Sequence, residues 1–494
     1  RGPALLPGWT SGSYVGGPVD RLSTLDAEFL HVEDGVAHMH IAGGCVFAGP
    51  PPSLDELGRL VEGKLHQIPR YRQRVRAVPL ELGRPIWADD PHFDLGYHLR
   101  RTALPTPGDD PAFCALMGRL MSQPLDRDRP LWETWLVEGL EGGNWAIVFK
   151  VHHCLVDGVA GAGLLEVLLD LQPSTDVPAP VPWTPAREPA GAAKVLGAWA
   201  GLARDAAAAV RGLPGAIRHP GSAVEAAATT AQGLARWVGH LGVTSPLSVD
   251  GAIGPHRVWA HADIALADVK AIGRAAGSTV NDVIVAAVTG GYRDLLIERG
   301  DDVEGAVFRS LVPVSTRRAD GDGVLDNRVS AMLYELPVGV ADPLERLRLV
   351  TAQLGALKGS RMAEAGALLT GIGDLAPPAA IGTVSRLATW AMRRLPQRSV
   401  NTVTTNVPGP QFPLYCLGRE MVAYRPFVPI FHGVRVGTAI LSYNGRVYVG
   451  VTGDYATAPQ VGVVARGAVR AVHEMREQLT AAGSARRRRR AHAG

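Results

Sequence analysis

The chain has 494 residues, of which 46% are hydrophobic and 20% charged, values typical of a globular protein that can bury a sizeable core. Lys and Arg number 50 and Asp and Glu 47, and this small surplus over so long a chain argues against a nucleic-acid-binding surface. The four cysteines stand far apart without a Cys-x-x-Cys pair, which argues against a disulfide framework or a zinc site and favours a reducing compartment.

Composition divides the chain into five parts. Residues 1–18 are rich in Gly and Pro and are expected to be disordered. A first α/β unit is predicted over 19–175 and a second over 256–480, joined by a Pro- and Ala-rich helical linker over 176–255, with a basic tail over 481–494. The linker is either a structural connector or a set of helices whose Trp and Leu faces lie on a membrane. The arginines of the tail are either solvated and disordered or attracted to anionic lipid.

In the first unit, hydrophobic periodicity predicts alternating helices and strands. Helices are expected at Leu22–Leu30, Leu54–Ile68 and Pro111–Met121, and strands at His38–Phe47, Arg84–Arg100 with a turn near Asp89, Arg129–Leu140 and Trp145–Val151. His38 and His40 share one face of their strand, but no third ligand for a metal lies near them, so no metal site is predicted.

The second unit shows the same mixture. Helices are expected at Leu266–Ala276, from Thr279 onward, at Leu344–Leu357 and at Val461–Leu479; strands are expected at Val258–Ile264, Val307–Ser315, Asn327–Leu336, Val400–Asn406, Val434–Tyr443 and Arg446–Thr452. Asn281 falls in the first turn of the helix that begins near Thr279.

The heptad His152–Gly158 follows the buried strand Trp145–Val151 and precedes an apolar helix predicted over Val159–Leu171. Successive strand side chains point to opposite faces, so His152 and His153 are not expected to share one ligand, and one of them should face a cleft. Strand, sharp loop and buried helix together form an arrangement that can present a catalytic side chain.

This heptad resembles the HHxxxDG signature of the bacterial wax ester synthase/acyl-CoA:diacylglycerol acyltransferases, within the wider superfamily of CoA-dependent acyltransferases that share HxxxD. Further blocks resemble that family in the same order: Leu25–Leu30, Pro130-Leu131-Trp132, Asn281-Asp282 and Asn406–Pro410. Two positions depart from it, since Asp326 replaces a usual Gly and Thr405 a usual Ser.

The resemblance implies an α/β fold of two chloramphenicol-acetyltransferase-like mixed-sheet domains with the active site in a channel between them. It implies transfer of a long-chain acyl group from acyl-CoA, a co-substrate rather than a cofactor, to the hydroxyl of diacylglycerol or of a long-chain alcohol. His153 would be the general base, a role that suits an imidazole near neutral pH. His152 would pack behind it, and Gly158 would let the chain turn toward the helix.

Roles can also be expected for the remaining candidate site residues. The resemblance implies that Asp157 forms a structural ion pair, for which Arg317 is the candidate partner. Asn281 is either the donor to the oxyanion or a helix N-cap, since both are common uses of Asn. The other candidates for substrate-binding or structural roles are Pro130, Leu131, Trp132, Thr405, Asn406, Pro408 and Gly409.

Two other functions remain open at this stage. One is a polyketide-associated or condensation-type acyltransferase that uses carrier-protein thioesters, and the other is a lipid-binding relative without catalysis. A covalent acyl-Cys154 mechanism is disfavoured because neighbouring strand residues point apart. With no predicted transmembrane helix or signal peptide, we expect a cytoplasmic protein, and peripheral contact with the inner membrane face or lipid droplets is an open alternative.

Overall fold

The computed structural model describes residues 20–79, 82–155, 167–197, 199–200, 244–315, 329–359 and 399–492. The predicted disordered N-terminus, the predicted helix Val159–Leu171 except its last residues, and most of the predicted linker lie outside these ranges. Within the described residues, no helix is both long and apolar enough to cross a bilayer.

The first sheet has six strands in the order β12-β13-β1-β6-β5-β4. Its strands are β1 (His40–Phe47), β4 (Leu99–Ala103), β5 (Trp132–Leu140), β6 (Asn144–His152), β12 (Tyr415–Cys416) and β13 (Arg419–Phe427). All neighbours pair antiparallel except β4 and β5, which run parallel. Strand β6 is buried along nearly its whole length, as its continuous apolar run predicts.

The helices and short strands around this sheet come from the same part of the chain. They are α1 (Thr24–Val32), α2 (Leu54–Lys64), α3 (Leu95–His98), α4 (Asp110–Met121) and the two-stranded ribbon of β2 (Gln73–Arg76) and β3 (Ile86–Asp89). The predicted helix Leu54–Ile68 ends at Lys64 and continues as 3-10 turns, and the single strand predicted over Arg84–Arg100 is interrupted by α3.

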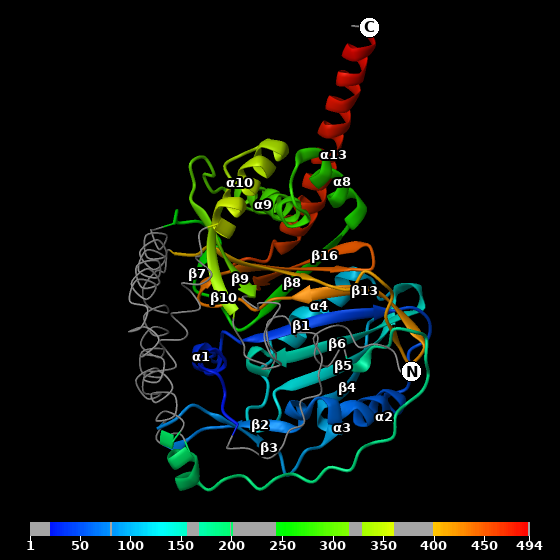
Figure 1. Cartoon of the computed structure of the whole chain (residues 1–494), viewed down its shortest axis with the longest axis vertical. Coiled ribbons are helices and arrows are strands. Elements are labelled where there is room, and N and C mark those ends of the chain that lie inside the picture. The colour runs from blue at the N-terminus through cyan, green and yellow to red at the C-terminus, as the bar shows by residue number, and fades with distance from the viewer. Residues whose placement is uncertain are drawn as a thin grey trace, which may run out of the picture.

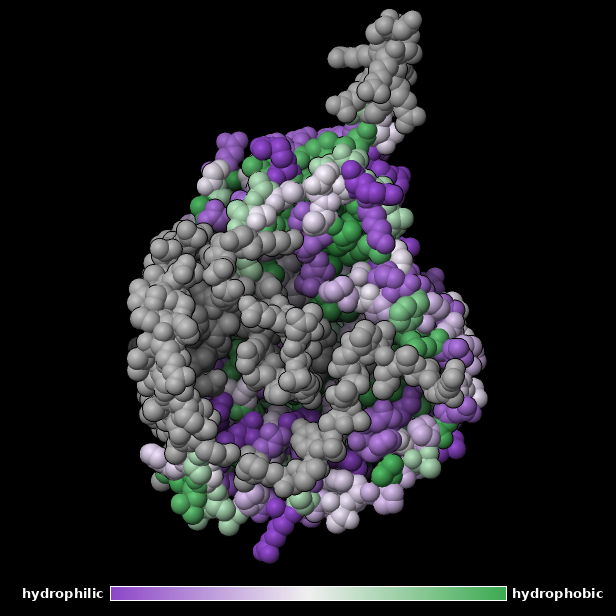
Figure 2. Space-filling view, viewed as in Figure 1, coloured by the Kyte–Doolittle hydropathy of each residue, from purple (hydrophilic) through white to green (hydrophobic). Residues whose placement is uncertain are grey.

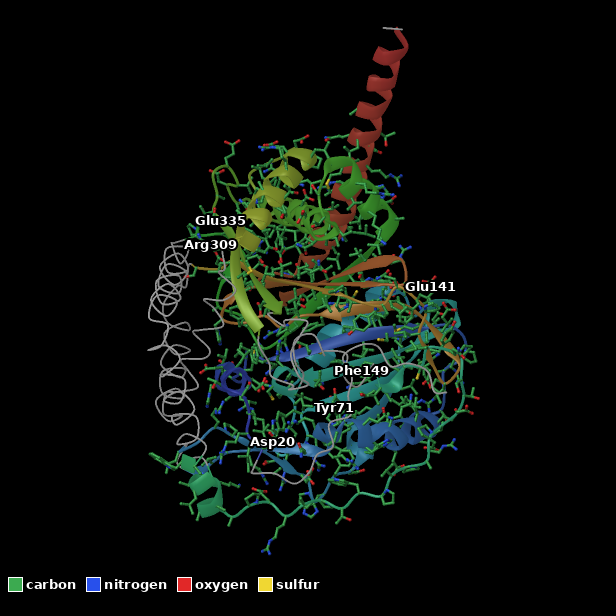
Figure 3. All side chains as sticks on the ribbon, viewed as in Figure 1. Asp20, Tyr71, Glu141, Phe149, Arg309 and Glu335 are labelled. Atoms are coloured by element: carbon green, nitrogen blue, oxygen red, sulfur yellow. The ribbon has the colours of Figure 1, made fainter. Side chains whose placement is uncertain are left out.

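The second sheet has six strands in the order β10-β9-β11-β15-β16-β8. They are β8 (Arg257–Ala265), β9 (Phe308–Ser315), β10 (Val329–Leu336), β11 (Thr402–Pro408), β15 (Val436–Tyr443) and β16 (Arg446–Asp454). Strand β11 runs parallel to both neighbours. A small ribbon pairs β7 (Asp250–Gly251) with β14 (Gly433–Val434). Figure 3 marks Arg309 and Glu335, whose side chains form an ion pair across β9 and β10 with 3.0 Å between Nη2 and Oε1.

Four helices pack on the second sheet, namely α8 (Leu266–Ala276), α9 (Val280–Glu298), α10 (Pro343–Gly359) and α13 (Val461–His492). Their apolar faces and the strands share one large hydrophobic core. Figure 1 shows these helices on the side of the second sheet away from the first, with the end of α13 projecting beyond the body. The helix runs through the basic cluster to His492, so the prediction that it closes near Leu479 was wrong.

The second half of the chain contributes strands to the first sheet, and the two halves also pack against each other. Strands β12 and β13 come from the last part of the chain but belong to the first sheet, where β13 pairs with β1. From the other half, the Trp259 indole of β8 donates a hydrogen bond of 3.2 Å to the carbonyl of Pro426 on β13. Helix α4 contacts β8 as well, and Arg257 N donates to Ser122 Oγ at its end at 2.8 Å. The prediction of two mixed-sheet units is confirmed, but the first sheet takes β12 and β13 from the second half, whereas all six strands of the second sheet come from that half.

Part of the predicted linker is described at its N-terminal end. Residues 191–197 and 199–200 are helical, and they include Leu196, 71% exposed, and Trp199, 56% exposed. Figure 2 shows hydrophobic side chains at the lower left, where this segment lies in Figure 1. Residues 201–243 are outside the described ranges, so the role of this segment stays a prediction.

Candidate active site

The main chain of the histidine pair is held from both sides. His152 is the last residue of β6, and its N–H donates 2.9 Å to the carbonyl of Leu131, just before β5. His153 opens a 3-10 turn, His153–Leu155, and its N–H donates 2.9 Å to the carbonyl of Met39, just before β1. His153 is therefore not part of the strand, but the pair does stand at the strand's end, as predicted.

The ring of His153 packs against Phe29 of α1, with 4.1 Å between the ring centroids. Burial, and then the neighbouring His152, lower the pKa of His153 to about 4. The imidazole is therefore neutral at pH 7 and free to accept a proton. Its Nδ1 is buried and has no hydrogen-bond partner among the described residues.

The ring of His152 lies against Cys154 in the turn that follows β6. Its Nδ1 accepts the N–H of Cys154 at 3.1 Å and lies 3.0 Å from the Cys154 sulfur. Because Nδ1 accepts, the proton of a neutral His152 resides on Nε2. Burial raises the pKa of the Cys154 thiol well above its ordinary value, so this cysteine is not a thiolate. It pairs with His152 rather than His153, which argues further against a covalent acyl-cysteine.

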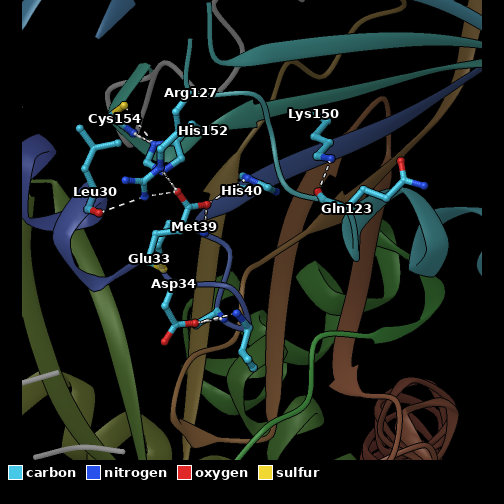
Figure 4. A network of polar contacts seen from close by, with 12 residues as sticks. Leu30, Glu33, Asp34, Met39, His40, Gln123, Arg127, Lys150, His152 and Cys154 are labelled. Carbon is cyan, nitrogen blue, oxygen red and sulfur yellow. Dashed lines mark hydrogen bonds and ion pairs between the residues drawn. The ribbon is translucent and has the colours of Figure 1, made fainter. Parts of the chain in front are cut away.

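Glu33, which the sequence analysis did not single out, lies against this pair (Figure 4). Its carboxylate oxygens lie 3.3 Å from His152 Nε2 and 3.2 Å from His40 Nε2, while Arg127 Nη2 donates to it at 2.6 Å. The two histidine contacts are close polar contacts that are not aligned as hydrogen bonds. Burial raises the pKa of Glu33, but the contacts with His152 and His40 outweigh it and hold this pKa well below its ordinary value.

No pattern in the chain points to Glu33, because it follows an ordinary amphipathic turn of α1. A signal exists only in the pairing of strands, where His40 of β1 stands directly opposite His152 of β6. That register brings two imidazoles together, and only an acidic or polar neighbour could satisfy both. Within the described residues, no group of three or more His, Cys, Asp or Glu side chains is arranged to hold a metal ion.

The Pro130-Leu131-Trp132 block supports β6 from the neighbouring strand. Leu131 and Trp132 are each 1% exposed. Trp132 opens β5, stacks on His98 with 4.4 Å between centroids, and donates its indole N–H to the carbonyl of Tyr71 at 2.8 Å. Together with the Leu131 carbonyl that holds His152, these contacts give Leu131 and Trp132 buried structural positions directly beside the histidine pair.

Asn281 and Asn406 meet although 125 residues separate them in the chain. Asn406 Nδ2, near the end of β11, donates to Asn281 Oδ1 in the first turn of α9 at 2.8 Å. The N-cap of α9 is Thr279, which forms a capping box with Asp282, so the alternative that Asn281 is the N-cap was wrong. The Asn281 carbonyl oxygen is engaged by Asn406, which leaves its amide N–H groups able to donate elsewhere.

The other predicted residues on β11 lie on the second sheet. Thr405 pairs with Ala439 and Pro408 with Ser442 of β15. A Cβ at Gly409 would overlap the carbonyl of Ser442, so glycine is required for this close approach. No polar contact joins these residues to His152 or His153 within the described part of the chain. Asp157, Gly158 and Arg317 lie outside it.

Two solved structures resemble this chain over nearly its whole length. The wax ester synthase/diacylglycerol acyltransferase from Marinobacter aquaeolei matches with a TM-score of 0.66 at 24% identity, over 93% of this chain and 100% of that one. The first condensation domain of the calcium-dependent antibiotic synthetase matches with a TM-score of 0.56 at 16% identity, over 93% of this chain and 97% of that domain. The fold is thus that of the two-sheet acyltransferases and condensation domains.

Sequence comparison narrows this class to a family. The wax ester synthase/diacylglycerol acyltransferase catalytic domain matches residues 22–284, and the C-terminal domain of the same family matches residues 325–476. A Mycobacterium tuberculosis protein named as a probable diacylglycerol O-acyltransferase is 38% identical over 456 residues, which is 91% of this chain and 94% of that protein. The chain belongs to the wax ester synthase/diacylglycerol acyltransferase family, and its prediction as an O-acyltransferase is confirmed.

Proposed function

We propose that this acyltransferase moves a long-chain acyl group from acyl-CoA to the hydroxyl of diacylglycerol, or of a long-chain alcohol, with His153 as general base. The observation that carries the proposal is the neutral, partly buried imidazole of His153 directly after β6 in a chain of this family. The relatives' names support the acceptor classes, since they include diacylglycerol O-acyltransferases and a wax ester synthase.

The reaction follows from what a neutral imidazole can do. An alcohol attacks poorly at neutral pH, so His153 removes its proton as the oxygen bonds to the thioester carbon. The tetrahedral intermediate then collapses, the carbon–sulfur bond breaks, and the imidazolium returns the proton to the departing CoA sulfur. Ester and free CoA leave, and His153 is neutral again.

The oxyanion of the intermediate needs a fixed donor, and Asn281 is the candidate. Asn406 occupies its carbonyl oxygen, which leaves its amide N–H groups available to donate. One such donor is worth about 3 to 4 kcal/mol in the transition state. Asp157 paired with Arg317 would hold the loop after His153, and the site would lie in a channel between the two halves. Thr405, Pro408 and Gly409 would line or shape the opposite wall.

The insolubility of the acceptor favours peripheral contact with a membrane or lipid droplet. The exposed Leu196 and Trp199 and the basic end of α13 are the segments that could make it. The carrier-dependent alternative keeps some support from the likeness to a condensation domain, although that likeness concerns the fold alone.

The test measures CoA release by the purified protein from a long-chain acyl-CoA, with hexadecanol or diacylglycerol offered in turn. We expect acceptor-dependent release that falls at least ~10²-fold in His153→Ala, because the general base is lost. His256→Ala, at an exposed position, is the control and should keep full activity. Acyl-CoA binding without any release by folded protein would overturn the proposal in favour of carrier-linked donors or lipid binding.

A further inference from the structure

We infer that Glu33 is a positioning residue for this reaction: its buried carboxylate holds His152 and, through the Met39 peptide group, the main chain of His153, so that the base points at the acceptor hydroxyl. The inference rests on the proposed role of His153. Glu33 would not touch substrate itself, and it acts through the residues that it holds.

Helix α1 contacts both histidines from one face. Phe29 lies on α1, and Glu33 is the C-cap of this helix, whose N–H donates to the Phe29 carbonyl at 3.3 Å. Phe29 packs on the His153 ring, and Glu33 lies 3.3 Å from His152 Nε2. The helix start is fixed by Ser23, whose side chain accepts the N–H of Asp26. One short helix therefore sets the position of both rings.

A second connection runs through the main chain. The N–H of Met39 points at Glu33 Oε1, 3.4 Å away, and the carbonyl of Met39 accepts the N–H of His153 at 2.9 Å. Figure 4 shows Glu33 at the centre of these contacts, between His40, His152, Met39 and Arg127. A displacement of the carboxylate would therefore reach His153 by two routes.

The negative charge of Glu33 is what lets this side chain face the N–H groups of all its neighbours at once. Its side chain is only 8% exposed, and Arg127 pairs with it through Nη2 at 2.6 Å and Nε at 3.2 Å, which compensates the buried charge. All of its neighbours present N–H groups, and a carboxylate is the one side chain with acceptors only. A glutamine would turn an NH₂ group toward one of these donors, so one contact must break.

The experiment compares Glu33→Gln with Glu133→Gln. Glu133 on β5 is likewise a buried carboxylate, 7% exposed, but it contacts Arg100, Lys150 and Trp135 rather than the histidines. In Glu33→Gln we expect kcat to fall about 10²-fold while KM for acyl-CoA stays within about twofold, since a misplaced base costs rate rather than binding. Glu133→Gln should keep the kcat of the wild type.

A mutant cycle tests whether Glu33 acts through the histidine that it touches. His152→Leu removes the ring but leaves Glu33 with Arg127 and His40, so this variant remains informative if Glu33→Gln fails to fold. If the inference is right, His152→Leu loses most of its kcat, and the double variant loses little more than the larger single loss.

The outcomes separate the inference from the proposed function. A wild type without acceptor-dependent CoA release would sink the proposed function whatever Glu33 does. If the wild type is active, any of three results would overturn the inference. Glu33→Gln could keep the wild-type kcat, Glu133→Gln could lose as much kcat as Glu33→Gln, or the kcat losses of Glu33→Gln and His152→Leu could multiply in the double variant. A rise in KM with unchanged kcat would overturn it too, because substrate binding would then be the affected step.

Discussion

Burial sets the protonation state of His153, and this has a direct kinetic consequence. A base works only in its neutral form, and the pKa of His153 lies at about 4, below the ordinary 6.5 of an imidazole. We therefore expect kcat/KM for acyl-CoA to stay level from neutral pH down to about pH 5 and to fall only as pH approaches the pKa of the free enzyme.

The measurement is a pH profile of initial rates, with tryptophan fluorescence in each buffer to confirm that the protein is folded. The residual rate of His153→Ala gives the background to subtract. An acid limb with its midpoint near pH 6.5 would contradict the prediction, because it would show a base in contact with water rather than a buried one.

At the residue level, the sequence pointed to His153, the proposed base, but not to the carboxylate of Glu33 beside the histidine pair. His153 was identified because its motif is contiguous, and the opposite roles of Asn281 were open because an Asn near a helix start suits either. The capping box of Thr279 and Asp282 decides against the cap. Glu33 was missed because its partners come from β1, β6 and the Arg127 loop, and no local pattern records that these segments meet.

At the level of elements, the sequence predicted helix ends correctly where a local signal, such as a C-cap glycine, determines them. Helix α8 has the predicted bounds, because Gly277 adopts φ 70° at its C-cap and stops it. Helix α13 continues past Leu479 and through Gly483, a residue type that often ends helices, since alanines and arginines, which are good helix formers, flank it. The entry of β13 into the first sheet depends on pairing with β1, almost 400 residues away in the chain, which hydrophobic periodicity does not reveal.

The close contact between β16 and β13 leads to a prediction about the free energy of unfolding. Gly450 of β16 lies against the carbonyl of Pro426 on β13, where an added Cβ would overlap the oxygen and crowd the Trp259 indole N–H that donates to it. Gly450→Ala must push the strands apart, and we expect a loss of about 1 to 3 kcal/mol in the free energy of unfolding.

Urea unfolding followed by fluorescence measures this loss. Gly355→Ala on α10 is the matched control, since its Cβ would meet nothing within 4 Å and an exposed helical Gly→Ala change should stabilise by up to about 1 kcal/mol. Equal free energies for the two variants would show that the strands at Gly450 are not closely packed.

For the molecule as a whole, the same exclusion of water that suits His153 also makes the fold sensitive to acid. Burial lowers the pKa of His40 to about 3 and those of His98, His153 and His261 to about 4. The unfolded chain binds protons at these histidines near pH 6.5, whereas the folded chain does so only near pH 4 or below. Stability is therefore unaffected above pH 6.5 and falls as pH drops through this window.

Two carboxyls, Asp250 and Asp294, oppose this trend, because burial raises the pKa of each above its ordinary value. Burial raises the pKa of Asp250 to about 6 from 3.8, so over most of the same window the folded chain holds a proton that the unfolded chain does not. Among the groups with the largest shifts, four histidines against Asp250 leave a net uptake of about three protons on unfolding, and each proton changes the free energy of unfolding by about 1.4 kcal/mol per pH unit. The expected slope is thus about 4 kcal/mol per pH unit near pH 5.

Urea unfolding at a series of pH values between 7.5 and 5 measures this slope. His261→Gln removes one of the four histidines, which lies beside Asp110 and away from the pair at β6, and should reduce the uptake by about one proton. A free energy of unfolding that stays level or rises over this range would mean that the histidines are solvated in the folded state. The neutral base inferred for His153 would then lose its physical cause, so the stability curve and the rate profile test one property of the core by independent means.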